Sequence, residues 1–122
     1  MRIDSEAVAR YYREMQVITL PQYARIAFLH ETMYNTVRRI LAGEEKNVRK
    51  QLDTVQNILV QLTAITKTDN DDDDDETSDE LLLLYDYLYV KLEYENKESL
   101  KDALEILKTL YETFDKLMKD MR

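Results

Sequence analysis

Three observations predict an all-α fold, an antiparallel up-down four-helix bundle with a short N-terminal helical arm, for this sequence of 122 residues. Glycine and proline occur once each, which is too few for the turns of a β-sheet protein. Hydrophobic residues make up 44% of the chain, which is enough for a packed core. Apolar residues recur at intervals of three and four, which is the spacing of amphipathic helices. The length indicates one domain, residues 1–122.

The N-terminal arm is expected to cover residues 1–19, with a short helix within it. The first bundle helix is expected over residues 21–42. Pro21 suits a first helical turn, because the N–H that proline lacks would have no partner there. Gly43 suits the position just after the last turn, where a positive φ is common.

The second helix is expected over residues 45–67. Its apolar seam, spaced by four and three residues, is typical of a bundle helix. The seam consists of Val48, Leu52, Val55, Leu59 and Leu62.

An acidic run follows, because residues 69–80 hold nine Asp and Glu and no Lys or Arg. Like charges at this density repel one another, so residues 68–77 are expected to form a solvated acidic loop. Thr77 and Glu80 have the spacing of a capping box, which predicts a third helix over residues 78–96.

The fourth helix has the clearest periodicity and is expected to run from a cap at Asn96 or Ser99 to about residue 120. Its seam has alternating spacings of three and four residues. The seam consists of Leu100, Ala103, Leu107, Leu110, Phe114, Leu117 and Met121. Short connections at 42–45 and 96–99 require the helices that they join to be antiparallel.

Composition and charge exclude several classes of function. Cysteine is absent, so disulfides, thiolate zinc sites and cysteine nucleophiles are excluded. The net charge is −8, but outside the acidic run the chain is near neutral and has no basic stripe for nucleic acid. The acidic run lacks the ligand spacing of a calcium loop, so we expect no metal and no cofactor. No apolar run is long enough for a membrane span, and the polar N-terminus is unlike a signal peptide, which together predict a cytoplasmic protein.

His30 is the only histidine and lies on the seam of the first helix. One interpretation is that His30 is a buried, hydrogen-bonded residue of the core. Its chemical interpretation is a phosphorelay histidine of a four-helix phosphotransfer module. That reaction needs an exposed imidazole, and the neighbouring Glu31 opposes a phosphoryl anion.

The helices carry more apolar surface than a bundle buries, since about three of every seven positions suffice. The first helix has two apolar stripes, and the second and third helices are also broad. Two interpretations stay open: the arm covers the surplus, or a groove accepts an amphipathic helix from a partner.

Three segments together resemble the FliS family of flagellar secretion chaperones, and they span about residues 9–118. The first contains Tyr12, Val17, Thr19 and Pro21 in the family's N-terminal order. The second, residues 55–62, is similar to a family segment on helix 2 with glutamine in its second position. The third and most specific is residues 84–92, followed by Asn96.

The resemblance implies a non-enzymatic cytoplasmic chaperone that holds the disordered C-terminal segment of flagellin in apolar grooves. It would prevent premature polymerisation, aid type III secretion and contact the flagellar export apparatus. Arm residues Tyr12 and Val17 would compete with this client. The residues predicted to bind the client are Ile58, Leu62, Ile65, Leu81, Leu84, Leu88 and Tyr85. Tyr87 and Tyr89 fit either the core or the client surface.

Two alternatives remain from the residues alone. One is the phosphotransfer module that uses His30, and the other is a structural bundle whose surplus faces form a homodimer. The oligomeric state is therefore expected to be a monomer or a weak homodimer.

Overall fold

The computed structural model describes residue 6, residues 20–68 and residues 76–120. Within these ranges the chain forms four α-helices and no strand, which confirms the all-helical prediction. The helices are α2 (Leu20–Leu41), α3 (Val48–Thr68), α4 (Glu76–Lys91) and α5 (Lys97–Asp120). The predictions on Tyr12, Val17 and Met121, and on the acidic residues 69–75, lie outside the described residues.

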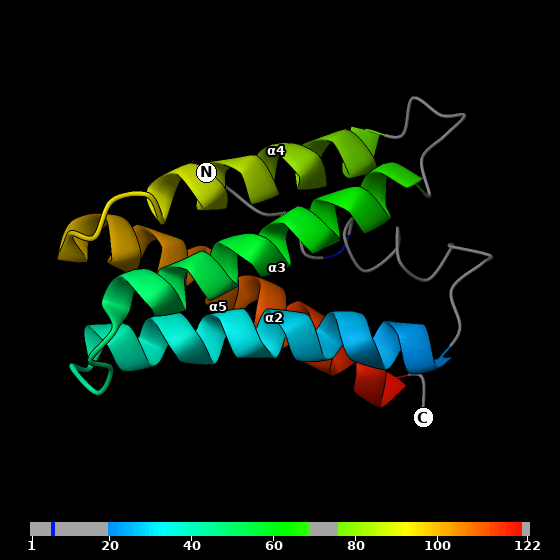
Figure 1. The fold of residues 1–122 in the computed structure, drawn as a ribbon. Helices are drawn as coiled ribbons and strands as arrows, with labels where there is room; N and C mark the ends of the chain where they lie inside the picture. The colour runs from blue at the N-terminus through cyan, green and yellow to red at the C-terminus, as the bar shows by residue number, and fades with distance from the viewer. Residues whose placement is uncertain (1–5, 7–19, 69–75, 121–122) are drawn as a thin grey trace.

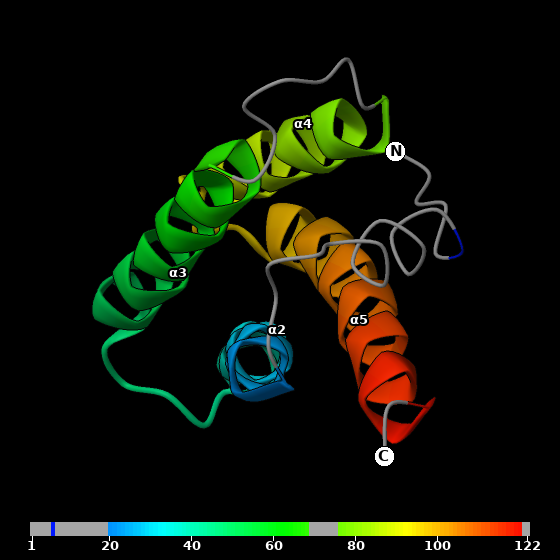
Figure 2. The same ribbon diagram turned by 90° about the vertical axis from the view of Figure 1, so that its right-hand side faces the viewer.

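The four helices lie lengthwise beside one another (Figure 1). α2 packs against α3 and α5, and α4 packs against the same two helices. Seen from one end, they surround a common centre, with α2 opposite α4 (Figure 2). All four helices contribute apolar side chains to this core, which explains why an amphipathic pattern recurs in each. The largest fully buried side chains include Tyr23, Met33, Leu52, Leu59, Leu81, Leu88, Leu107 and Phe114.

α2 ends in a Schellman motif at the only glycine of the chain. Gly43 has φ of 77°, which is the left-handed region that favours glycine. The N–H of Glu44 donates to the carbonyl of Arg39 at 3.0 Å, and the N–H of Gly43 donates to that of Ile40 at 3.1 Å. The predicted role of Gly43 is therefore confirmed.

α3 begins at Val48, three residues later than the predicted start at residue 45. Residues 44–47 carry the chain out of the left-handed turn before the helix starts. The carbonyl of Asn47 accepts a hydrogen bond from the N–H of Gln51 at 3.0 Å, which is the first bond of the new helix.

α4 begins earlier and ends earlier than predicted. It starts at Glu76, so Thr77 lies inside the helix and the predicted capping box is wrong. α4 ends at Lys91 instead of residue 96 because Asn96 caps the next helix. The Oδ1 of Asn96 accepts a hydrogen bond from the N–H of Ser99 at 2.8 Å.

The predicted seams form the core of the described helices. On α5 every predicted seam residue from Leu100 to Leu117 is buried. On α3, Leu52, Val55, Leu59 and Leu62 are buried, and Val48 is half-buried beside them. Periodicity therefore identified the inward face of these two helices.

Candidate protein-binding groove

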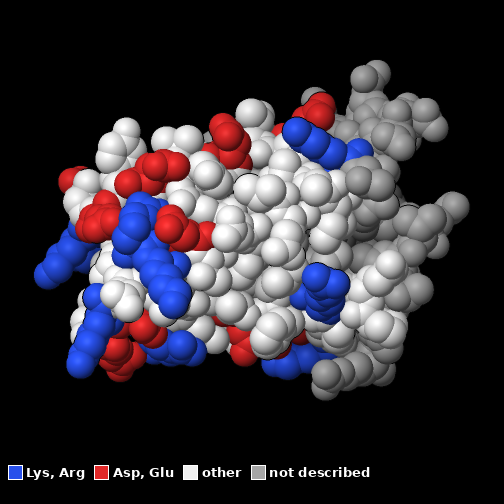
Figure 3. Space-filling model, viewed as in Figure 1, with Lys and Arg blue, Asp and Glu red and all other residues white. Residues whose placement is uncertain are grey.

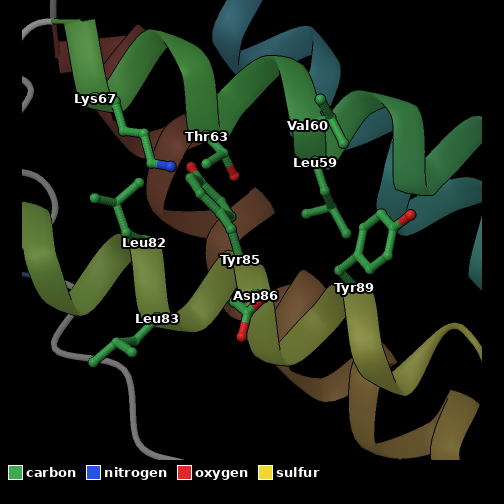
Figure 4. A pocket seen from close by; sticks show the side chains of 9 residues that line it. All are labelled: Leu59, Val60, Thr63, Lys67, Leu82, Leu83, Tyr85, Asp86 and Tyr89. Atoms are coloured by element: carbon green, nitrogen blue, oxygen red, sulfur yellow. The ribbon is translucent and has the colours of Figure 1, made fainter.

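A surface groove of about 450 Å³ lies between α3 and α4, and we call it the α3/α4 groove. Both helices supply its walls along several turns (Figure 4). Its lining consists of Leu59, Val60, Thr63, Lys67, Leu82, Leu83, Tyr85, Asp86 and Tyr89. Six of these nine side chains are aliphatic or aromatic, so the groove suits an apolar partner.

The floor and the rim of the groove differ in exposure. Leu59 and Tyr85 are fully buried and form the floor. Val60 is 55% exposed, Leu83 is 64% exposed and Tyr89 is 37% exposed, so these three form an apolar rim. Large apolar side chains at this exposure, grouped around one depression, are the usual mark of an interaction surface.

Charged side chains are sparse around the groove. α3 has no charged residue between Asp53 and Lys67, which is more than three helical turns. In the space-filling view, charges crowd one end of the molecule, and a broad uncharged area extends over the middle (Figure 3). Lys67 and Asp86 are the two charged residues that line the groove. An apolar partner would therefore displace little bound water from charged groups.

The structure places six of the seven predicted client residues in the core, which corrects the prediction that they form an accessible surface. Ile65 is half-buried, and Tyr85 reaches the groove only as part of its floor. The buried residues are Ile58, Leu62, Leu81, Leu84, Leu88 and Tyr85. The physical reason is that a stripe with helical spacing fits an inward face as well as a binding face, and the packing of four helices uses this stripe for the core.

The exposed rim residues were missed, except for Tyr89, which the sequence left open between core and client. Leu83 belongs to four consecutive leucines, and a helix cannot turn all four toward one side. The run of leucines therefore indicated that α4 has an apolar side chain on its outer face. Val60 lies between two seam positions and gave no periodic signal. Tyr87 is half-buried.

A hydrogen-bonded cluster fixes α3 against the end of α4 and so holds the groove walls in register. The side-chain amide of Gln56 donates to the carbonyl of Tyr89 at 3.0 Å and to Oε1 of Glu93 at 3.2 Å. Its carbonyl accepts from Arg49 at 2.8 Å. Gln56 is buried. It donates to a carbonyl in the last turn of α4, where no N–H of the same helix follows to serve as the donor.

Arg49 extends this cluster to the chain that leaves α4. Its guanidinium donates to the carbonyls of Leu92 and Glu93 at 3.4 Å each. It also pairs with the carboxylate of Asp53 at 2.9 Å on its own helix. Side chains of α3 therefore satisfy carbonyl groups at the C-terminal end of α4.

The groove floor is connected to the buried histidine. The hydroxyl of Tyr85 lies 3.0 Å from Nε2 of His30, and Nδ1 of His30 lies 2.8 Å from the carbonyl of Ile26. A carbonyl only accepts, so Nδ1 carries the proton, Nε2 accepts, and the Tyr85 hydroxyl donates. The imidazole also stacks on the ring of Phe114, with centroids 4.0 Å apart.

Burial determines the charge of His30. The side chain is fully buried, and the desolvation that this causes lowers its pKa from 6.5 to about 4, against the opposing effect of the bond to Ile26. His30 is therefore neutral near pH 7. The structure gives it the packing role and contradicts the exposed imidazole that phosphotransfer requires.

Neither metal ligation nor a membrane span is indicated by the described part of the chain. Among residues 20–68 and 76–120, no group of three or more His, Asp and Glu side chains is placed to hold a metal ion. In the same ranges, no helix combines the length and the apolar character that crossing a membrane demands.

No protein family, curated protein or solved structure matches this chain. The function is therefore inferred from the α3/α4 groove and from the three sequence segments that resemble a known family.

Proposed function

We propose that this protein is a cytoplasmic, non-enzymatic export chaperone that binds the disordered C-terminal segment of flagellin. The single observation that carries the proposal is the α3/α4 groove, with its apolar rim of Val60, Leu83 and Tyr89 and its sparse charge. Grooves of this kind accept the apolar face of an amphipathic helix. Bound flagellin would be kept from polymerising prematurely and would be delivered to the flagellar type III export apparatus.

The proposed fold is an antiparallel up-down four-helix bundle with an N-terminal arm. Connections of a few residues, between Leu41 and Val48 and between Lys91 and Lys97, support the antiparallel arrangement. The packing of α2 on α5 closes the ring. Such a bundle leaves the outer sides of α3 and α4 available to a partner.

The energetics of the proposed complex favour a long, shallow contact. Covering apolar surface contributes about 25 cal/mol per Å². A disordered segment loses conformational entropy when it becomes helical, and this cost offsets most of the gain. We therefore expect modest affinity from the groove alone, with the remaining client segment adding contacts elsewhere on the bundle.

The N-terminal arm is proposed to compete with the client through Tyr12 and Val17, which lie outside the described residues. Replacement of Tyr12 by alanine is then expected to leave client binding equal or tighter and to make the free protein less stable. Weaker client binding with unchanged stability would contradict the competing arm.

The direct test is a calorimetric titration of the full chain with a synthetic peptide of the flagellin C-terminal segment. We expect saturable binding, a negative heat-capacity change from apolar burial and a gain of helical circular dichroism. A scrambled peptide of the same composition is the control. Equal heats for both peptides would contradict the proposal.

Sedimentation equilibrium of the free protein tests the competing structural role. A dimer that excludes the flagellin peptide would show that a second copy occupies the groove. A monomer that binds the peptide agrees with the chaperone function.

A further inference from the structure

The α3/α4 groove has different chemistry at its two ends. Lys67 on α3 and Leu82 on α4 face each other at one end, and Val60 and Tyr89 bound the other end (Figure 4). Asp86 lies between these ends, on the α4 wall and about one helical turn beyond Leu82. A helix in this groove would therefore meet a cation first and an anion one turn later.

Both charges are available to a partner. Lys67 and Asp86 are exposed, and in the described part of the chain neither forms an ion pair within 4.0 Å. A bound helix would exclude water from around them, and an opposite charge on that helix would compensate for the lost hydration. Side chains of the wrong sign would be repelled, so this pair of charges discriminates between occupants.

We infer that the groove accepts its client helix in one direction, with a carboxylate in the first turn of the client beside Lys67 and a basic residue one turn later beside Asp86. This inference depends on the proposed function, because it assigns a direction to the same client. The client helix then runs from Lys67 toward Tyr89, in the same direction as α4.

The helix dipole is a second reason to expect this direction of the client helix. A carboxylate is stabilised in the first turn of a helix and a cation toward its end, and an acidic residue four positions before a basic one is the better order. The charges of the groove and the dipole of the client agree only when the N-terminus of the client lies at Lys67. The reversed helix would satisfy Lys67 only with a carboxylate in its last turn.

The test compares two synthetic amphipathic helices that have the same apolar face and composition. One has glutamate in its first turn and lysine one turn later, and the other has these two residues exchanged. At low salt we expect the first peptide to bind about threefold to tenfold more tightly, as partly screened charge pairs allow. Salt at about 1 M, where the screening length is about 3 Å, is expected to remove the difference.

Charge-reversal variants identify the residue responsible. Lys67→Glu is expected to abolish the preference between the two peptides, because both charges of the groove are then acidic and each peptide gains one attraction and one repulsion. Lys116→Glu is the matched control, because it makes the same charge change at an exposed position of α5. The preference is expected to survive in the control. A preference that Lys67→Glu leaves unchanged would overturn the role of Lys67.

A nitroxide label on the N-terminus of the glutamate-first peptide reports direction independently of affinity. We expect stronger paramagnetic broadening of the amide signals of Lys67 and Leu82 than of those of Leu59 and Tyr89, because the label then lies about one groove length closer to the first pair. Stronger broadening at Leu59 and Tyr89 would overturn the inferred direction.

The failure of this inference and that of the proposed function are distinguishable. If the two peptides bind equally, or if neither binds, while the flagellin peptide still binds, the directional groove is wrong and the chaperone function stands. If the two peptides are discriminated but the flagellin peptide does not bind, the groove is directional and its proposed client is wrong.

Discussion

Tyr85 and His30 form a hydrogen bond of 3.0 Å between α4 and α2, the two helices that lie opposite each other in the ring. The same Tyr85 forms the floor of the α3/α4 groove. The hydroxyl thus joins the floor of the groove to the bundle centre, where His30 stacks on Phe114. A groove whose floor is fixed in this way presents its rim residues on a rigid support.

His30 is expected to make the protein less stable in acid. Its pKa is about 4 in the folded chain and near 6.5 when unfolded. Between these values the unfolded state binds more protons, so the free energy of unfolding falls as the pH is lowered from about 6.5 to 4. The full loss is about 3 kcal/mol. Urea unfolding across this pH range measures it.

The matched variant for this pH dependence is His30→Phe, which keeps a ring against Phe114 and cannot be protonated. All carboxylates remain the same, so the difference between the two pH profiles isolates the histidine. We expect a shallower profile for the variant. Parallel profiles would contradict a buried neutral His30.

Gln56 is expected to stabilise the protein through its hydrogen bonds to the C-terminal end of α4. Gln56→Ala removes the donor to the carbonyl of Tyr89 and the acceptor for Arg49, leaving buried groups without these partners. The expected loss is about 2 kcal/mol in the free energy of unfolding. Amide exchange should accelerate in the last turn of α4. Gln61→Ala, at an exposed position of the same helix, is the control and should change little.

Local signals in the sequence predicted local features well. Gly43 and Asn96 end and begin helices through bonds to residues three to five positions away, so their roles follow from the chain itself. The inward stripe of α5 was also predictable, because its opposite face is polar and charged from Lys97 to Asp120. In these cases a single segment contains all the information needed.

The candidate site was less predictable because α4 is apolar on several sides. Leu81 and Leu84 pack in the core while Leu83, between them in sequence, is exposed. Which of these leucines faces inward depends on where the other helices pack, and periodicity does not contain that information. The bond between His30 and Tyr85 joins residues 55 positions apart, so no local pattern shows it.

Glycine is expected to be favoured at position 43 because of its positive φ, and not because a side chain would clash there. With φ of 77°, alanine is disfavoured, yet a Cβ built there meets nothing within 4 Å. Gly43→Ala should therefore lower the free energy of unfolding by about 1 kcal/mol, and Gly43→Asn should cost less because asparagine tolerates this region. Glu44→Ala, in the same connection, is the control. A loss of several kcal/mol would indicate a steric role that the structure does not show.

The α3/α4 groove is tested most directly by two valines of similar exposure. Val60 is 55% exposed and lines the groove, whereas Val90 is 48% exposed and is not among its lining residues. Val60→Lys places a charge against the apolar face of the client, and we expect binding of the flagellin peptide to weaken about fivefold to tenfold. Calorimetric titration measures the change.

Val90→Lys is the matched variant, because it introduces the same charge on a helix that also forms the groove. The two substitutions are expected to have small and similar effects on urea unfolding, since both side chains reach solvent. A loss of affinity confined to Val60→Lys therefore reports contact with the client and not a general change in charge or stability. Equal losses in the two variants would place the client on a wider surface that includes both α3 and α4, and no loss in either would show that the client does not bind in the groove.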